Sequence, residues 1–310
     1  MQSYALTIGT RGSPLALYQA RLVQRLICET SGRALEDVII KILKTSGDTI
    51  KGDLKDFGGK GLFTRELEQA LLAGSIDVAV HSMKDVPTVG HEDLVIKAIL
   101  PRADVRDAFI SVKHKSIADL PEGALIGSAS LRRRAQLAAM RPDLKFCLLR
   151  GNVGTRLKKL EDGVCDATML ACAGLRRLEQ DDRITEAVGT EFMLPAPAQG
   201  AIGIETPRDQ TDLNAILAPL NDRSAELEIT AERAFLRALD GNCRTPIAAL
   251  ARMEGERLTL HGEILAKDGS LRVGRNVTAN VVTAFDAYDL GFKTGEDVRN
   301  EVAGRITFDE

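Results

Sequence analysis

Arginine side chains are concentrated in one stretch of the chain, residues 128–156. That stretch contains one lysine, Lys145, and one acidic residue, Asp143, whereas the whole chain has a formal net charge of -3 at pH 7. Crowded guanidinium groups repel one another, and burying one without a partner costs several kcal/mol. Either water solvates this face or an anionic ligand belongs beside it. The arginines are Arg132, Arg133, Arg134, Arg141, Arg150 and Arg156.

Four loop motifs outside this stretch could also do chemistry. They are Gly58-Gly59-Lys60-Gly61, residues 81–87, residues 195–200 and residues 241–246. The first is not a nucleotide-binding P-loop, because Leu54 and Gly61 stand where that motif needs Gly and Ser or Thr. It suits either a mobile loop that brings Lys60 over a cleft or a plain surface turn.

Residues 81–87, with the sequence HSMKDVP, follow an expected strand. Lys84 and Asp85 therefore point from a strand end into whatever lies beyond it. Their alternative role is an ordinary solvated ion pair.

Cys243 differs from the other cysteines of the chain. Core packing is the expected role of Cys28, Cys147 and Cys172, and Cys165 has no evident role. Cys243 instead follows a glycine-ended helix and precedes Arg244, and a loop thiol near a cation tends towards the reactive thiolate. No histidine adjoins it as a catalytic base, so permanent attachment of a cofactor is an open alternative.

Length and composition bound the kind of protein. A chain of 310 residues exceeds the usual single core and predicts two or three domains. No apolar run reaches signal-peptide length or the ~18 residues of a membrane span, which predicts a cytoplasmic protein without a membrane partner. The scattered cysteines fit reduced thiols, and the dispersed histidines argue against a zinc site. With 4% aromatic residues, no tryptophan and a pI of about 5.9, the chain does not fit a nucleic-acid binder.

The first two-thirds of the chain alternates expected strands with amphipathic helices. The expected strands are 4–10, 38–43, 77–80, 94–100, 108–111, 125–127, 146–149 and 167–171. Helices are expected from Ser13, as N-cap, and Pro14 onwards, and over 63–72, 131–140 with Ser130 as N-cap, and 153–160. The strand, loop and helix around Ser13 repeat around Ser130, which predicts two similar α/β domains. Ligands bind such sheets at the carboxyl ends of the strands, where helix N-termini offer N–H groups to anions.

The last ninety or so residues change character. A helix is expected over 225–239, followed by strands 258–266 and 271–279 joined through Asp268-Gly269, a typical hairpin turn. This pattern predicts a small third domain of α+β type.

Taken together, these motifs resemble the porphobilinogen deaminase family, also called hydroxymethylbilane synthase, over nearly the whole chain. The matching motifs are 10–15, 58–63, 81–87, 130–133, 149–156 and the Cys243 loop. Two positions depart from the family pattern: Ala198 stands where Gly is usual, and Asn242 where a Gly often precedes the cysteine.

The resemblance implies two α/β domains of the periplasmic-binding-protein type (type II) around a cleft, plus a small C-terminal α+β domain. Domain 1 would comprise residues 1–100 and 200–220, domain 2 residues 101–199, and domain 3 residues 221–310. A solute-binding or regulatory effector module would share the cleft, but it would need neither Cys243 nor the third domain.

The implied activity is that of a transferase in haem and tetrapyrrole biosynthesis. Such enzymes join four molecules of porphobilinogen head to tail, with loss of ammonia, onto a dipyrromethane primer, and release hydroxymethylbilane by hydrolysis. The resemblance implies one dipyrromethane per chain, linked through a thioether to Cys243, in a cytoplasmic monomer with no nucleic-acid partner.

Site roles follow from the matching positions. The catalytic residue is Asp85, whose carboxylate would stabilise positive charge that develops on a pyrrole as ammonia leaves. The cofactor would be held by Cys243, Lys84, Asp85, Ser130, Arg132, Arg133 and Arg150. The substrate would be bound by Arg11, Ser13, Lys60, Ser82, Arg150, Arg156, Arg177 and Gln199. Arginine suits the acetate and propionate groups of pyrrole units because its fork binds carboxylates bidentately. Arg134 and Arg141 match no such role, and for them a solvated helix face is expected.

Overall fold

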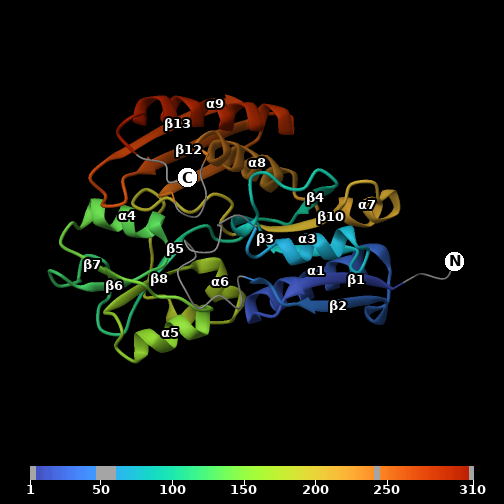
Figure 1. Cartoon of the computed structure of the whole chain (residues 1–310), viewed down its shortest axis with the longest axis horizontal. Helices are drawn as coiled ribbons and strands as arrows, with labels where there is room; N and C mark the ends of the chain where they lie inside the picture. Colours follow the sequence, from blue (N-terminus) through green and yellow to red (C-terminus); the bar gives the residue numbers. More distant parts are fainter. Residues whose placement is uncertain (1–4, 47–60, 241–244, 307–310) are drawn as a thin grey trace. The chain divides into compact units, whose positions relative to one another are not determined.

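The computed structural model describes residues 5–46, 61–240 and 245–306 (Figure 1). Its internal contacts divide the chain into two compact units. The first comprises Met1–Ala103 and Ala201–Leu227, and the second comprises Asp104–Gly200 and Glu228–Glu310. Each unit is described by itself.

The first unit contains a five-stranded sheet in the order β2-β1-β3-β10-β4. Its strands are β1 (Leu6–Arg11), β2 (Val38–Leu43), β3 (Val78–Ser82), β4 (Leu94–Ile99) and β10 (Ile202–Pro207). β1 pairs in parallel with β2 and β3, and β10 lies antiparallel between β3 and β4. The sequence did not predict β10. This strand follows the strands of the second sheet along the chain but belongs to the first sheet.

Helices cover both faces of this first sheet. They are α1 (Pro14–Ser31), α3 (Arg65–Leu72) and α7 (Thr211–Leu217), with the short turns η1 (Leu35–Asp37), η3 (Met83–Asp85) and η5 (Ala218–Leu220). One apolar core joins Val23 and Ile27 of α1 to Leu6 of β1, and another joins Leu67 of α3 to Ala79 of β3. As predicted, Ser13 caps α1, and Pro14 is its first residue.

The second unit contains a five-stranded sheet in the order β7-β6-β8-β5-β9. Its strands are β5 (Asp107–Ser111), β6 (Leu125–Gly127), β7 (Lys145–Cys147), β8 (Ala167–Ala171) and β9 (Glu186–Ala187). Its helices are α4 (Leu131–Met140), α5 (Val153–Glu161), α6 (Cys172–Arg177) and η4 (Asp181–Arg183). β6 is parallel to β7 and β8, and β5 is antiparallel to β8. The order matches the first sheet strand for strand, which confirms the predicted repeat and the predicted fold class.

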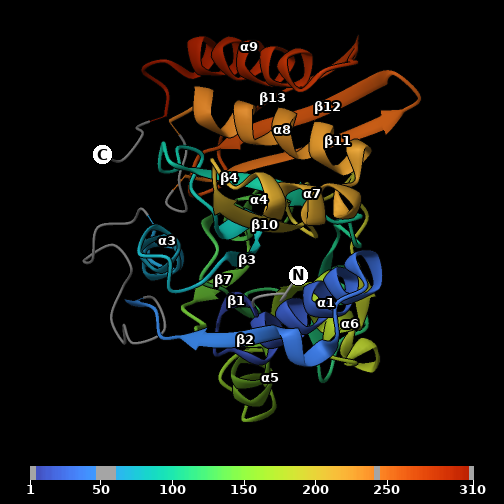
Figure 2. The ribbon, with the colours of Figure 1, turned by 90° about the vertical axis from the view of Figure 1, so that its right-hand side faces the viewer.

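A three-stranded antiparallel sheet completes the second unit. It consists of β11 (Ile247–Glu254), β12 (Arg257–Leu265) and β13 (Arg272–Asn280), with helices α8 (Arg223–Ala238) and α9 (Ala284–Val302). Figures 1 and 2 show α9 running along this sheet. The predicted helix and hairpin are confirmed within one or two residues, whereas β11 and α9 were not predicted.

Several predicted boundaries were wrong. β3, expected over 77–80, runs from Val78 to Ser82, so His81 and Ser82 belong to the strand and not to the loop after it, and α3, expected from residue 63, begins at Arg65. The strand expected over 146–149 ends at Cys147, and Leu148 is 53% exposed. The strand expected over 4–10 runs to Arg11, so that Arg11 ends the strand instead of beginning the loop. In the part of the chain that the structure describes, no helix has the length and apolarity needed to cross a membrane.

Close packing of α9 on α8 gives the first prediction. A Cβ at Gly291 would lie 2.1 Å from the carbonyl oxygen of Ala231, so the helices would have to separate to admit it. We expect Gly291→Ala to destabilise the protein by about 1–3 kcal/mol, although alanine favours a helix by ~1 kcal/mol over glycine. The thermal unfolding midpoint measures the effect.

The matched control is Gly154→Ala in α5, where the nearest atom to an added Cβ lies 3.7 Å away. This variant should be neutral or slightly stabilised. A Gly291→Ala midpoint equal to that of Gly154→Ala would contradict the close contact.

Candidate active site

Asp85 lies on the η3 turn that follows β3 in the first unit. Lys84 and Asp85 are exposed, while Met83 between them and the strand is buried. A backbone hydrogen bond anchors the turn, because the Met83 N–H donates at 3.0 Å to the carbonyl of Ala201, the residue just before β10. The arrangement presents a carboxylate and an ammonium group at the end of a rigid strand.

Two pairs of polar side chains, one buried and one partly buried, fix the end of β3. Nε2 of His81 lies 3.0 Å from Oε2 of Glu205 on β10, and both side chains are buried. Gln19 of α1, 2% exposed, donates from Nε2 to the Ser82 hydroxyl at 2.9 Å. Ser82 is therefore oriented by the helix that Ser13 begins.

Arg11 and Ser13 lie at the same edge of this sheet as Asp85, because β1 and β3 are parallel neighbours. The Arg11 guanidinium lies over the Phe63 ring, 4.2 Å from its centroid, which restricts the rotation of its side chain. The Ser13 oxygen accepts the Ala16 N–H at 3.2 Å, as an N-cap does. Its hydroxyl hydrogen is the group it can offer to a ligand.

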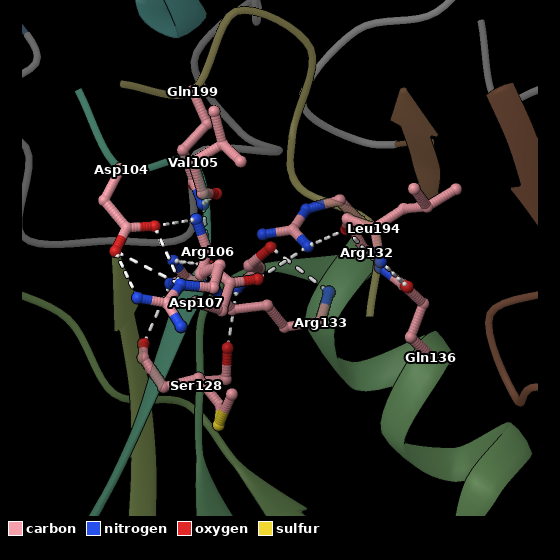
Figure 3. Close-up of polar contacts among 12 residues, drawn as sticks. Asp104, Val105, Arg106, Asp107, Ser128, Arg132, Arg133, Gln136, Leu194 and Gln199 are labelled. Atoms are coloured by element: carbon pink, nitrogen blue, oxygen red, sulfur yellow. Dashed lines mark hydrogen bonds and ion pairs between the residues drawn. The ribbon is translucent and has the colours of Figure 1, made fainter. Parts of the chain in front are cut away.

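In the second unit, Arg132 and Arg133 are not on a solvated face. They are 5% and 6% exposed and converge on Asp107, which is 0% exposed (Figure 3). Nη1 of Arg132 lies 2.8 Å from Oδ2, and Arg133 donates to Oδ1 from Nη2 at 2.7 Å and from Nε at 3.1 Å. Each carboxylate oxygen thus serves one arginine.

Neutral groups complete this cluster. Nε2 of Gln199 donates to Asp107 at 2.9 Å and to the carbonyl of Val105 at 2.7 Å. Arg132 donates to the carbonyl of Leu194 at 2.6 Å, and Gln136 exchanges hydrogen bonds with the same residue. Arg132 is therefore held by Leu194, in the segment before β10, as well as by Asp107, whereas Arg133 donates to Asp107 and to the carbonyl of Met169 at 2.8 Å.

The charges of this cluster do not balance. Burial alone would raise the pKa of the Asp107 carboxyl, but Arg132 and Arg133 outweigh burial and hold that pKa well below its usual range. Burial lowers the pKa of the Arg132 guanidinium, and Asp107 opposes that effect. Two guanidinium groups against one carboxylate leave one net positive charge. The buried Nε of Arg132 has no acceptor among the described residues, so the cluster is suited to an additional anion.

The remaining predicted arginines extend from the same edge of the second sheet. Arg150 precedes α5, Arg156 lies in α5, and Arg177 ends α6, and these helices follow the parallel strands β7 and β8. Nε of Arg156 donates to the carbonyl of Gly151 at 2.8 Å, and Nη2 of Arg177 donates to that of Gly200 at 2.7 Å. The edge therefore gathers several cations beside the N-termini of α4 and α5.

Comparison with known proteins identifies the family of the chain. Residues 6–215 match the family model described as "Porphobilinogen deaminase, dipyromethane cofactor binding domain", and residues 226–300 match "Porphobilinogen deaminase, C-terminal domain". The chain belongs to the porphobilinogen deaminase family.

Curated relatives support the same assignment. A porphobilinogen deaminase of Paracoccus denitrificans is 52% identical over 98% of this chain and 95% of its own length. One from Nitrobacter hamburgensis is 49% identical over 96% of each chain.

Among solved structures, the periplasmic aliphatic sulphonate binding protein from Escherichia coli aligns with 76% of this chain and 70% of its own, at 17% identity and a TM-score of 0.41.

Two of the predicted porphobilinogen deaminase site residues, Lys60 and Cys243, lie outside the described residues, as does Asn242. The others fall into two groups. One group shares an edge of the first sheet and consists of Arg11, Ser13, Ser82, Lys84 and Asp85. The other group belongs to the second unit and consists of Ser130, Arg132, Arg133, Arg150, Arg156, Arg177 and Gln199.

The expectation for the two unassigned arginines was wrong for Arg141. Arg141 forms a bidentate pair with Asp143, at 2.7 Å for each bond, and donates to the carbonyls of Ile117 and Leu120. The pair lowers the pKa of Asp143 to about 2, chiefly through the hydrogen bond from Arg141. Arg141 therefore joins loops of the second unit. Arg134 stacks over Phe146, 5.4 Å from the ring centroid.

Sequence reasoning missed Asp107. It begins a mostly apolar strand, Asp-Ala-Phe-Ile-Ser, that is buried along most of its length. A charged residue in such a strand is a signal for a buried partner, because isolated burial of a carboxylate is costly. The signal does not say which cation the partner is.

Ala198, the departure from the family pattern, adopts a left-handed backbone with φ of 63°. This conformation costs a non-glycine residue about 1 kcal/mol or more. Its N–H donates to the buried carboxylate of Glu232 at 2.6 Å, and Glu232 also accepts the N–H of Ala251 at 2.7 Å. The α8 carboxylate thus holds the strained loop that carries Gln199.

We expect Ala198→Gly to raise the thermal midpoint and to increase the free energy of unfolding by up to about 1 kcal/mol. Relief of backbone strain should stabilise the folded state by more than the greater entropy of glycine stabilises the unfolded chain. Ala196→Gly, in the same loop but without a positive φ, should instead lower stability by about 0.5–1 kcal/mol. Equal losses in the two variants would rule out strain at Ala198.

Proposed function

We propose that this protein joins four porphobilinogen molecules head to tail, with loss of ammonia, onto a dipyrromethane primer and releases hydroxymethylbilane by hydrolysis. The match to both family models carries this proposal. The net positive arginine cluster beside further cations supports it, since each substrate unit brings two carboxylates.

The residues present fit the dipyrromethane cofactor. An orphaned buried donor at Arg132 and an unbalanced positive charge suit a ligand with several carboxylates. We assign Cys243 as the thioether attachment point, with one cofactor per chain, and place Lys84, Asp85, Ser130, Arg132, Arg133 and Arg150 around the cofactor. When bound, the cofactor supplies the pyrrole end to which the first substrate unit is joined.

The proposed role of Asp85 is electrostatic. Its carboxylate lies exposed at a strand end that Met83, His81 and Ser82 hold rigid. A fixed anion near a pyrrole N–H stabilises positive charge as ammonia leaves, with little reorganisation during the step.

Substrate carboxylates are assigned to the cations at the two sheet edges. The proposed ligands are Arg11, Ser13, Lys60, Ser82, Arg150, Arg156 and Arg177. Gln199 was also predicted to bind substrate, but it is 1% exposed and donates to Asp107, which favours a supporting role. We further propose the three-domain division 1–100 with 200–220, 101–199 and 221–310, and a cytoplasmic monomer.

Asp85→Asn tests the catalytic role. We expect the variant to fold and to carry its cofactor but to lose about 100-fold or more in kcat, because the amide cannot offset positive charge on the pyrrole. Porphobilinogen consumption in single-turnover and steady-state assays measures this loss.

Asp93→Asn is the control, since Asp93 is an exposed aspartate of the same unit, 70% exposed at its side chain. It should retain activity. If Asp85→Asn is as active as Asp93→Asn, Asp85 takes no part in the reaction.

Intact-protein mass spectrometry tests the cofactor. The purified protein should carry an adduct of two pyrrole units, and Cys243→Ser should lack it. Cys28→Ser, at a partly exposed thiol of α1, should keep it. Fully active wild-type protein of unmodified mass would refute the attachment. A solute-binding module would likewise show no adduct.

A further inference from the structure

Asp107 has a position that no ligand-binding role explains. Its side chain is fully buried, so it cannot itself touch a cofactor or substrate. Its Oδ1 accepts from Arg133, and its Oδ2 forms an ion pair with Arg132 at 2.8 Å but has no hydrogen-bond partner among the described residues. Any effect of Asp107 on a ligand must therefore pass through the side chains that it contacts, which are Arg132, Arg133 and the neutral amide of Gln199.

In the described parts of the chain, no other carboxylate forms an ion pair with Arg132 or Arg133. Glu263 of β12 contributes a favourable charge to Arg132, but its Oε2 accepts from Nε of Arg272 at 2.6 Å. Asp104, three residues before Asp107, pairs with Arg106 at 2.7 Å and Arg176 at 2.9 Å. Among the described residues, Asp107 is the carboxylate that pairs directly with Arg132 and Arg133.

α4 itself is firmly seated in the second unit. The β12–β13 turn packs so tightly on it that a Cβ at Gly269 would lie 2.4 Å from the backbone nitrogen of Ala139. Hydrogen bonds between Gln136 and Leu194 hold its middle turn. Because the helix cannot easily shift, charge repulsion between its first-turn arginines must be relieved locally.

We propose that Asp107 is a positioning residue that acts as a resident counter-ion, holding Arg132 and Arg133 in their binding geometry before the cofactor is attached. This inference rests on the proposed function. Asp107 neutralises one of the two charges, so the cluster folds without ligand and retains one positive charge for a cofactor carboxylate. The cofactor and Asp107 then share the task of balancing the arginines.

This sharing predicts a measurable coupling. Asp107→Asn leaves two buried cations with no anion, and a bound cofactor carboxylate can compensate in part. The loss in thermal midpoint should therefore be larger without cofactor than with it, by at least about 3 °C. A purely structural aspartate would cost the same in both forms.

The experiment uses the full chain in two backgrounds, the protein with its attached cofactor and Cys243→Ser purified without porphobilinogen. Asp107→Asn is compared in both with Asp104→Asn, a partly buried aspartate that also pairs with two arginines but forms no ion pair with Arg132 or Arg133. Asp104→Asn should lower the midpoint equally in both backgrounds. Equal losses for Asp107→Asn would overturn the inference.

If Asp107→Asn does not fold in either background, a second variant tests the same inference. Asp107→Asn combined with Arg132→Met restores the net charge of the cluster to +1 and should recover folded protein. Failure of this double variant would show that charge balance is not the role of Asp107, and would overturn the inference.

The mass of the parent protein distinguishes failure of the proposed function from failure of the role proposed for Asp107. An unmodified parent overturns the proposed function. A modified parent with equal Asp107→Asn losses in the two backgrounds leaves the proposed function intact and overturns the role of Asp107 alone.

Discussion

The second unit is organised around one carboxylate shared by two guanidinium groups in its interior. Asp107, Arg132 and Arg133 are each at most 6% exposed, so all three charges have lost most of their hydration. Buried ion clusters of this kind commonly stabilise a fold no better than well-packed apolar side chains would. Their presence here is better explained by binding than by stability, because the surplus positive charge gives the fold an affinity for anions that an apolar core would lack.

The topology explains how the cluster is assembled. β5 runs antiparallel to β8, so its first residue, Asp107, lies opposite Ala171 at the edge where the parallel strands end and α4 begins. In the first sheet, the residue just before the antiparallel strand β10 supports the turn that carries Asp85, since the carbonyl of Ala201 accepts the Met83 N–H. In both sheets, the antiparallel strand or the residue before it provides a backbone or side-chain contact at the edge that carries the proposed site residues.

Local features of the fold could be predicted from the sequence, and long-range ones could not. Ser13 and Ser130 cap helices as expected, and β2, β6, β8 and α4 have the predicted bounds, because capping and periodicity depend on neighbouring residues. β10 escaped prediction because its identity depends on strands more than a hundred residues earlier, as the pairing of His81 with Glu205 illustrates. Asp107 was missed for the same reason, since residues 128–156 hold the arginines but not their partner.

The arginines consequently divide by environment and not by sequence position. Arg141 pairs with the carboxylate of Asp143 and donates hydrogen bonds to loop carbonyls, so its charge is compensated within the fold. Arg132 and Arg133 share an anion that balances only half of their charge. The loop that supplies Gln199 to this anion passes through Ala198, whose left-handed backbone is held by the buried carboxylate of Glu232. Because Gln199 follows Ala198 directly, the backbone conformation of Ala198 helps to set where the Gln199 amide meets Asp107.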